Sequence, residues 1–265
     1  MMKKLTSPTG KPIELQPIRS SAAVHGKYQS ELNALVSDMT SSYIYWLKAN
    51  WRKETKLAQD KRHTANLKTI LSKLGKKWSK RFDKMANEIA RMFVDGSAKH
   101  NRVAMMAVLK KAGFTVELKL TDSLRDAMTE SIAENVALIK SIGSEYHSSI
   151  EKQVFRTVAA GGDLSRLVDM LKNTHGVTQR RASFIALDQT NKARAQMESV
   201  RRQELGITHA VWMHSHAGKV PRPSHVKAHG EVFEVDKGLY LDGEWVLPSQ
   251  AINCRCTSKS IIKGF

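Results

Sequence analysis

The chain has 265 residues, of which 41% are hydrophobic and 26% charged, so it is long and apolar enough to bury one large core or two small ones. Lys and Arg number 43 against 25 Asp and Glu, and the resulting net charge of +18 favours a polyanion such as nucleic acid as partner. With two cysteines, no apolar leader and no apolar run of about 20 residues, the sequence excludes a secreted disulfide scaffold. We expect a protein made in a reducing cytoplasm with no membrane partner.

The first two segments are predicted to be an extended N-terminal arm over residues 1–27 and a basic helical region over residues 28–120. Prolines among polar residues indicate the arm. In the helical region, apolar residues recur every three or four positions and form one stripe. The stripe comprises Leu67, Leu71, Leu74, Trp78, Phe82, Met85, Ile89 and Met92. A shorter helix over 101–112, closed by Gly113, and a weak strand over 115–120 follow.

The helical region also carries a block of positive charge. Between Leu47 and Arg81 there are twelve Lys or Arg residues and two acidic residues. We interpret this block as a non-specific contact for double-stranded DNA, because Lys and Arg neutralise phosphates without reading sequence. The candidate DNA-binding residues are Lys53, Lys56, Lys61, Arg62, Lys73, Lys76, Lys77, Lys80 and Arg81. The alternatives are a solvated helix face and a basic helix lying on a membrane surface. Trp78 is expected in the core because it lies on the apolar stripe.

Residues 121–207 are predicted to be a second helical part. A helix begins at Thr121 or Asp122 and is expected to end at Gly143, and another covers 145–160. The buried face of the first is expected to comprise Leu124, Met128, Ile132, Val136, Ile139 and Ile142. A short helix from Asp163 is expected to end near Gly176, and Thr178 is expected to cap a longer one that stops at Gly206.

Residues 208–265 are predicted to form a small module of short strands and turns, because Gly and Pro interrupt this part of the chain frequently. The predicted fold class is therefore mainly α with a small C-terminal α+β domain. Long helices precede a short-stranded, turn-rich module that contains most of the histidines and both cysteines.

The His and Cys residues of this module suit a metal ion. Alternate residues of an extended strand share one face, so Cys254 and Cys256 should point the same way, as should His214 and His216. His225 is a further candidate ligand, and sulfur and imidazole donors suit tetrahedral zinc. A structural zinc is therefore the candidate cofactor, with His214 or His216 as the fourth ligand. The alternative is a set of hydrogen-bonded histidines beside two small buried thiols.

The module also carries a family resemblance. The run from Trp212 through Pro221-Arg222-Pro223-Ser224-His225 to Asn253-Cys254-Arg255-Cys256 resembles the C-terminal part of phage minor head proteins, the phage Mu F-like head-morphogenesis family. The resemblance extends upstream and covers approximately residues 120–258. It departs from the family pattern at His216-Ala217-Gly218-Lys219, where many members have an Asp, so an acidic role is not carried over to that position.

The resemblance implies a virion protein of a tailed bacteriophage, located in the head interior and without enzymatic activity. Such a minor capsid protein would associate with the portal protein and with capsid or scaffold proteins, enter the procapsid, and act in head morphogenesis and in DNA packaging or ejection. The alternative from the residues themselves is a metal-dependent nuclease that uses the His/Cys cluster. A nuclease normally needs an acidic metal ligand or a base beside an open metal position, in a spacing that is not recognisable here.

Overall fold

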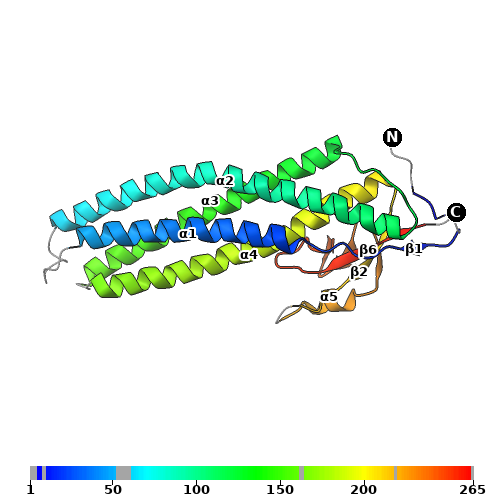
Figure 1. The fold of residues 1–265 in the computed structure, drawn as a ribbon. Helices are drawn as coiled ribbons and strands as arrows, with labels where there is room; N and C mark the ends of the chain where they lie inside the picture. The colour runs from blue at the N-terminus through cyan, green and yellow to red at the C-terminus, as the bar shows by residue number, and fades with distance from the viewer. Residues whose placement is uncertain (1–4, 8–9, 52–60, 161–163, 218–219, 264–265) are drawn as a thin grey trace. The chain divides into compact units, whose positions relative to one another are not determined.

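The computed structural model describes residues 5–7, 10–51, 61–160, 164–217 and 220–263, with the backbone alone for residues 61–63. The helices are α1 (Ala22–Asn50), α2 (Lys61–Lys111), α3 (Asp122–Ala159), α4 (Leu164–Glu204) and α5 (Pro223–Lys227). The strands are β1 (Ile13–Glu14), β2 (His209–Met213), β3 (Val232–Glu234), β4 (Leu239–Leu241), β5 (Glu244–Val246) and β6 (Thr257–Ile262). Long helices followed by short antiparallel strands confirm the predicted fold class (Figure 1).

The chain divides into two compact units. Unit 1 comprises Met1–His25, Met92–Ile132 and Leu187–Phe265, and unit 2 comprises Gly26–Arg91 and Ala133–Ala186. Each of the long helices α2, α3 and α4 contributes one segment to each unit.

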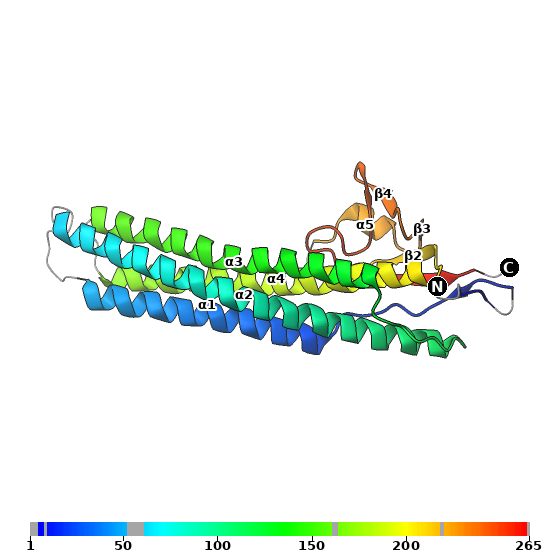
Figure 2. The ribbon, with the colours of Figure 1, turned by 90° about the horizontal axis from the view of Figure 1, so that it is seen from above.

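Unit 2 is a bundle of α1 and the adjoining segments of α2, α3 and α4, which lie side by side in both views (Figure 1, Figure 2). The predicted apolar stripe of α2 faces the core: Leu67, Leu71, Leu74, Trp78, Phe82 and Ile89 are buried, while Met85 and Met92 are half-buried. Trp78 is a core residue, as predicted. The buried stripe of α1 includes Tyr28, whose hydroxyl donates a hydrogen bond of 2.7 Å to the Asn135 side chain on α3.

Two predicted helix ends were wrong. Helix α3 continues through Gly143 and α4 continues through Gly176, because neither glycine adopts the left-handed conformation that ends a helix. Gly143 instead permits close packing, since a Cβ there would lie 2.8 Å from the Phe82 ring. Gly113 and Gly206 do end α2 and α4, and both have positive φ angles.

The buried face of α3 also differs from its prediction. Leu124, Ile139 and Ile142 are buried, but Met128, Ile132 and Val136 are only half-buried. In the middle of α3, the buried face is shifted by one residue. The residues that directly precede Met128, Ile132 and Val136 are buried instead, namely Ala127, Ser131 and Asn135. The apolar pattern missed this shift because two of the three buried residues are polar.

Unit 1 contains a four-stranded antiparallel sheet in the order β1-β6-β2-β3 and a two-stranded sheet of β4 and β5. Along β6, burial alternates, so that Ser258, Ser260 and Ile262 face inward. One apolar cluster joins the N-terminal arm to α2 and β6 and includes Leu15, Ile18 and Leu109. A second cluster surrounds Trp212 and includes Phe233 and Val235. The module after Gly206 therefore has an apolar core of its own.

Three further local predictions need correction. The segment 101–112 is the end of α2 rather than a separate helix, and α1 begins at Ala22, within the predicted arm. The segment 115–120 is not a strand. It is a connection whose Leu118 packs into the apolar cluster of the arm. In the described part of the chain, no helix is both long enough and apolar enough to span a membrane.

Candidate functional site

The most tightly organised set of reactive side chains is a buried cluster of His225, Cys254 and Cys256 in unit 1. The exposed fractions of these residues are 5%, 3% and 3%. His225 Nδ1 lies 3.5 Å from Cys254 Sγ and 3.7 Å from Cys256 Sγ, and the three atoms lie within 4.8 Å of one another. Both cysteines are free thiols. The structure thus brings together three of the five residues that the sequence predicted as metal ligands.

Three elements position the cluster. His225 lies in α5, which begins after Arg222 with Pro223 in its first turn, and both cysteines lie in the segment just before β6. The Arg222 guanidinium donates a hydrogen bond of 2.9 Å to the Ile252 carbonyl oxygen and so ties the start of α5 to the cysteine segment. On β2, Trp212 packs edge-on against the His225 ring, with ring centroids 5.2 Å apart.

The cysteine segment is held from helix α4 as well. Asp188 accepts a hydrogen bond of 2.6 Å from the backbone N–H of Asn253, which adopts a left-handed conformation. The backbone N–H of Ser249 donates to Cys254 Sγ at 3.4 Å. These contacts fix the direction in which the thiols point before any ligand arrives, as outer contacts do in protein metal sites.

The two thiols have different proton affinities. The hydrogen bond from Cys256 lowers the pKa of Cys254 to about 5, against the effect of burial. The same contact, together with burial, raises the pKa of Cys256. The contact between the thiols therefore favours ionisation of one sulfur and disfavours ionisation of the other, as in other pairs of thiols that share one site.

His214 and His216 belong to a neighbouring group of histidines rather than to the thiol triangle. Strand β2 ends at Met213, and His216 has a φ angle of 52°, so the two do not alternate on one strand. Their rings lie 4.7 Å apart, and His216 also contacts the His229 ring at 5.3 Å. Burial, together with His216 and His229, lowers the pKa of His214. His214 nevertheless lines the same pocket as the His225 and cysteine cluster.

The sequence analysis missed a buried ion network on α4. Glu198 accepts hydrogen bonds from Arg194, at 2.8 Å, and from Arg202. Arg194 also donates to Ser249 Oγ at 2.7 Å and to the Cys256 carbonyl oxygen at 3.2 Å. Arg202 donates to Ser260 Oγ on β6 at 2.8 Å. The i, i+4 spacing of Arg, Glu and Arg was the available signal, but it is equally typical of an exposed helix face.

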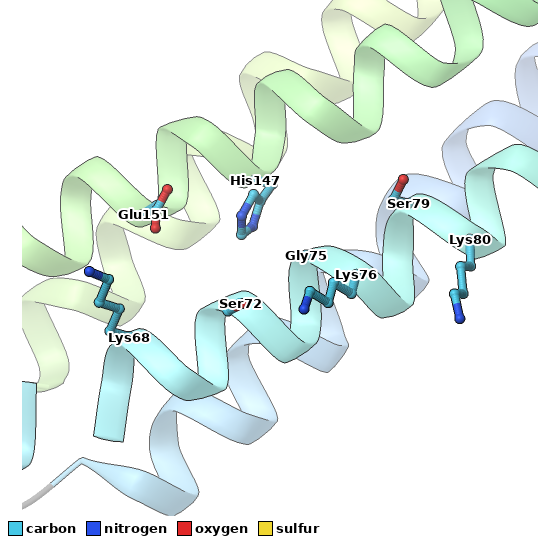
Figure 3. Close-up of a pocket in the computed structure, with 8 residues that line it drawn as sticks. All are labelled: Lys68, Ser72, Gly75, Lys76, Ser79, Lys80, His147 and Glu151. Carbon is cyan, nitrogen blue, oxygen red and sulfur yellow. The ribbon is translucent and has the colours of Figure 1, made fainter. Parts of the chain in front are cut away.

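A second candidate site is the basic face of α2 in unit 2. Lys73, Lys76, Lys77 and Lys80 recur at helical spacing and are exposed, and none makes a salt bridge within the described residues. Part of this face borders an open pocket lined from α2 by Lys68, Lys76 and Lys80 and from α3 by His147 and Glu151. Figure 3 shows the lysines along α2, with His147 and Glu151 on α3.

The remaining predicted DNA-binding residues fall into two groups. Lys53 and Lys56 lie outside the described residues, as do the side chains of Lys61 and Arg62 in α2. The side chain of Arg81 is partly neutralised, because its guanidinium lies 2.8 Å from the Asp38 carboxylate.

Comparisons with known proteins bear on the module that contains the cluster. Residues 148–259 match the profile of the family described as Phage Mu protein F like protein, in agreement with the resemblance seen in the sequence. A protein of Haemophilus influenzae described as uncharacterized is 29% identical over 180 residues, which are 67% of this chain. The chain spans 39% of the length of that relative. No solved structure matches.

Proposed function

We propose that this chain is a minor head protein of a tailed bacteriophage, because residues 148–259 match the family described as Phage Mu protein F like protein. In this proposal it joins the procapsid in the host cytoplasm, associates with the portal and with capsid or scaffold proteins, and stays in the head interior. There it acts in head morphogenesis and in DNA packaging or ejection. The family match is the observation that carries the proposal.

The family match covers the end of α3, all of α4, strands β2 to β5 and the first half of β6, and so includes residues of both units. We assign the contact with other head proteins to this matched region. Mass spectrometry of heads from the virus or prophage that encodes the chain should find it at low copy number. Its absence from both procapsids and mature heads would contradict the assignment.

We assign the non-specific DNA contact to the basic face of α2. The four lysines Lys73, Lys76, Lys77 and Lys80 span about 10 Å of helix, since each residue rises about 1.5 Å. Double-stranded DNA carries about one phosphate charge per 1.7 Å of its axis, so a face of this length meets several phosphates. Lysines at this spacing form one exposed strip and need no base-specific geometry to bind.

A charge-matched pair of variants tests this assignment. Replacing Lys73, Lys76, Lys77 and Lys80 with Gln should weaken binding to duplex DNA at least about tenfold. It should also reduce the slope of log K against log salt concentration by roughly 3.6, because each phosphate contact contributes about 0.9. The control replaces Lys99, Lys110, Lys111 and Lys119, which are exposed in unit 1, and changes the net charge equally. Equal losses in a mobility-shift titration would mean that overall charge, rather than the α2 face, attracts DNA.

The nuclease alternative has weaker support. The described residues lining the pocket beside the His225 and cysteine cluster include Arg222, Asn253 and Arg255, but neither Asp nor Glu. A hydrolytic metal site in a nuclease usually includes an acidic ligand, and the described lining here offers His214 as a candidate base but no such ligand. Incubation of plasmid DNA with the protein and divalent cations should therefore leave the plasmid uncut.

A further inference from the structure

We infer that His225, Cys254 and Cys256 form a zinc site with three protein ligands, buried in the module that the family match covers. The triangle of one imidazole nitrogen and two sulfurs is the juxtaposition that carries this inference. Nitrogen and sulfur donors are the set that zinc prefers in proteins, whereas magnesium and calcium prefer oxygen.

The distances in the triangle fit a metal ion. Two ligands of a tetrahedral zinc, with bonds of about 2.3 Å to sulfur and about 2.0 Å to nitrogen, lie about 3.5 Å apart. His225 Nδ1 lies 3.5 Å and 3.7 Å from the two sulfurs. An ion at the centre of the three atoms would therefore require little movement of the side chains.

The orientation of His225 also favours a shared centre over a simple hydrogen bond. A single ring nitrogen has either one lone pair or one proton, so it can make one well-directed hydrogen bond. Here the same nitrogen faces both sulfurs at nearly equal distances, and both sulfurs are buried. A metal ion satisfies all three donor atoms at once and removes the cost of leaving them partly unpaired.

The surrounding contacts resemble the support that protein metal sites give to their ligands. The N–H of Ser249 points at Cys254 Sγ, and Asp188 anchors the backbone at Asn253, the residue before Cys254. The Trp212 indole N–H is buried beside the cluster and has no nitrogen or oxygen acceptor among the described residues. Donors directed at a thiolate are the usual companions of zinc–sulfur bonds.

His214 also lines the pocket beside the triangle, but we do not assign it as the fourth ligand of the ion. His214 Nδ1 accepts a hydrogen bond of 3.1 Å from the backbone N–H of His216. In the neutral ring, the proton then lies on Nε2, which has no lone pair for a metal. The pocket beside the triangle is lined by Arg222, Asn253 and Arg255, so water or a group from another head protein can complete the coordination.

Metal content and cobalt substitution of the full-length protein test the site. The protein purified without chelator should contain close to one zinc per chain. After chelation, added Co²⁺ should give the intense near-ultraviolet sulfur-to-cobalt band and the visible bands of a tetrahedral ion. Chains free of zinc that give no such bands with Co²⁺, or chains whose mass is lower by the two hydrogens of a disulfide, would overturn the inference.

Matched variants separate the ligands from their neighbours. Cys254→Ser keeps the size of the side chain but removes a soft ligand, and it should lower zinc content at least tenfold. His214→Asn offers an amide oxygen in place of Nδ1 and should retain the full zinc content. If Cys254→Ser fails to fold, reversible removal of zinc from the wild-type chain supplies the same comparison. Equal metal loss in both variants would show that His214 is a ligand, contrary to the three-ligand site.

Discussion

The interiors of the two units are built on different principles. Among the described residues, every buried Asp, Glu, Arg and His lies in unit 1, where Glu198 sits between two arginines and His225 faces two thiols. In unit 2, the buried polar groups are neutral, such as the Tyr28 hydroxyl on Asn135 and the Tyr43 hydroxyl on His147 Nδ1.

This difference follows from the secondary structure of each unit. The backbone N–H and C=O groups of a long helix form hydrogen bonds with one another, so the helices of unit 2 need only side chains of complementary shape to pack together. In unit 1, short strands and turns leave carbonyl groups that must find donors elsewhere. A guanidinium has five N–H donors, and Arg194 uses them to join α4 to Ser249 and to the carbonyl of Cys256. Charged side chains thus donate hydrogen bonds to backbone groups that have no partner in a neighbouring strand.

The largest expected change in the free energy of unfolding comes from removing the charge of Glu198, the buried counterion in unit 1. Glu198→Gln leaves Arg194 and Arg202 without a balancing charge and should lower the free energy of unfolding by about 3–5 kcal/mol. Burial already lowers the pKa of Arg202, and the Glu198 carboxylate acts in the opposite direction. Urea unfolding, with hydrogen exchange of the β6 amides as a local probe, measures the loss.

The control for this variant is an exposed ion pair of unit 2. Lys140 lies 2.7 Å from Asp83, and both side chains are about half exposed. Asp83→Asn should therefore change the free energy of unfolding by no more than about 0.5 kcal/mol. Similar losses for Glu198→Gln and Asp83→Asn would remove the contrast between the two interiors.

A smaller effect tests shape packing in unit 2. Gly143→Ala places a methyl group 2.8 Å from the buried Phe82 ring and should destabilise the protein by about 1–3 kcal/mol. Gly26→Ala in α1 has no atom within 4 Å of the added methyl group. It should stabilise by about 0.5–1 kcal/mol, because alanine loses less backbone entropy in a helix. Opposite signs in thermal unfolding are the expected outcome, and equal signs would contradict close packing at Gly143.

The sequence predicted part of this organisation. The α2 stripe and the core position of Trp78 follow from local spacing, because helical periodicity fixes which residues share a face. Cys254 and Cys256 do point to one site as predicted, but they lie before β6 and not on a strand, and His225 was grouped with them through the family pattern. A recognisable family pattern in the C-terminal segment pointed to phage heads, and residues 148–259 match that family.

The parts that sequence reasoning missed depend on distant contacts. Nothing near Gly143 shows that Phe82 lies against it, so the residue was interpreted as a helix end. Arg194, Glu198 and Arg202 have the spacing of an exposed ion-pair face, and only the packing of α4 against β6 buries them. The backbone N–H of His216 donates a hydrogen bond to His214 and so orients its ring. This contact depends on the left-handed backbone conformation of His216, whereas the sequence analysis placed both histidines on one extended strand.

The last stability prediction concerns alkaline pH, and its effect should be specific to unit 2. Burial raises the pKa of Tyr146 to about 12, and burial also raises the pKa values of Tyr28 and Tyr43. A raised folded-state pKa means that the stabilisation is complete below pH 10, the unfolded value, and is lost as pH rises from 10 to 12. For Tyr146 alone, the loss at pH 11 should be about 1.4 kcal/mol.

Hydrogen exchange at pH 8 and at pH 11 separates the two units. The amides of Ala133–Ala186 should lose protection at the higher pH, and Tyr146→Phe should reduce that loss. Tyr45→Phe is the control, since Tyr45 is 66% exposed. A loss of protection confined to β2 and β6 would place the alkaline sensitivity in unit 1 and would contradict the prediction.

We propose a head protein whose basic helix contacts DNA, and photo-crosslinking inside intact heads tests this proposal most directly. Purified DNA-filled heads are irradiated, digested and searched for peptides joined to nucleotides. We expect nucleotide-linked peptides of this chain from the α2 segment that carries Lys73, Lys76, Lys77 and Lys80. Heads that contain the chain but yield such peptides only from unit 1, or none at all, would contradict the assignment of DNA contact to α2.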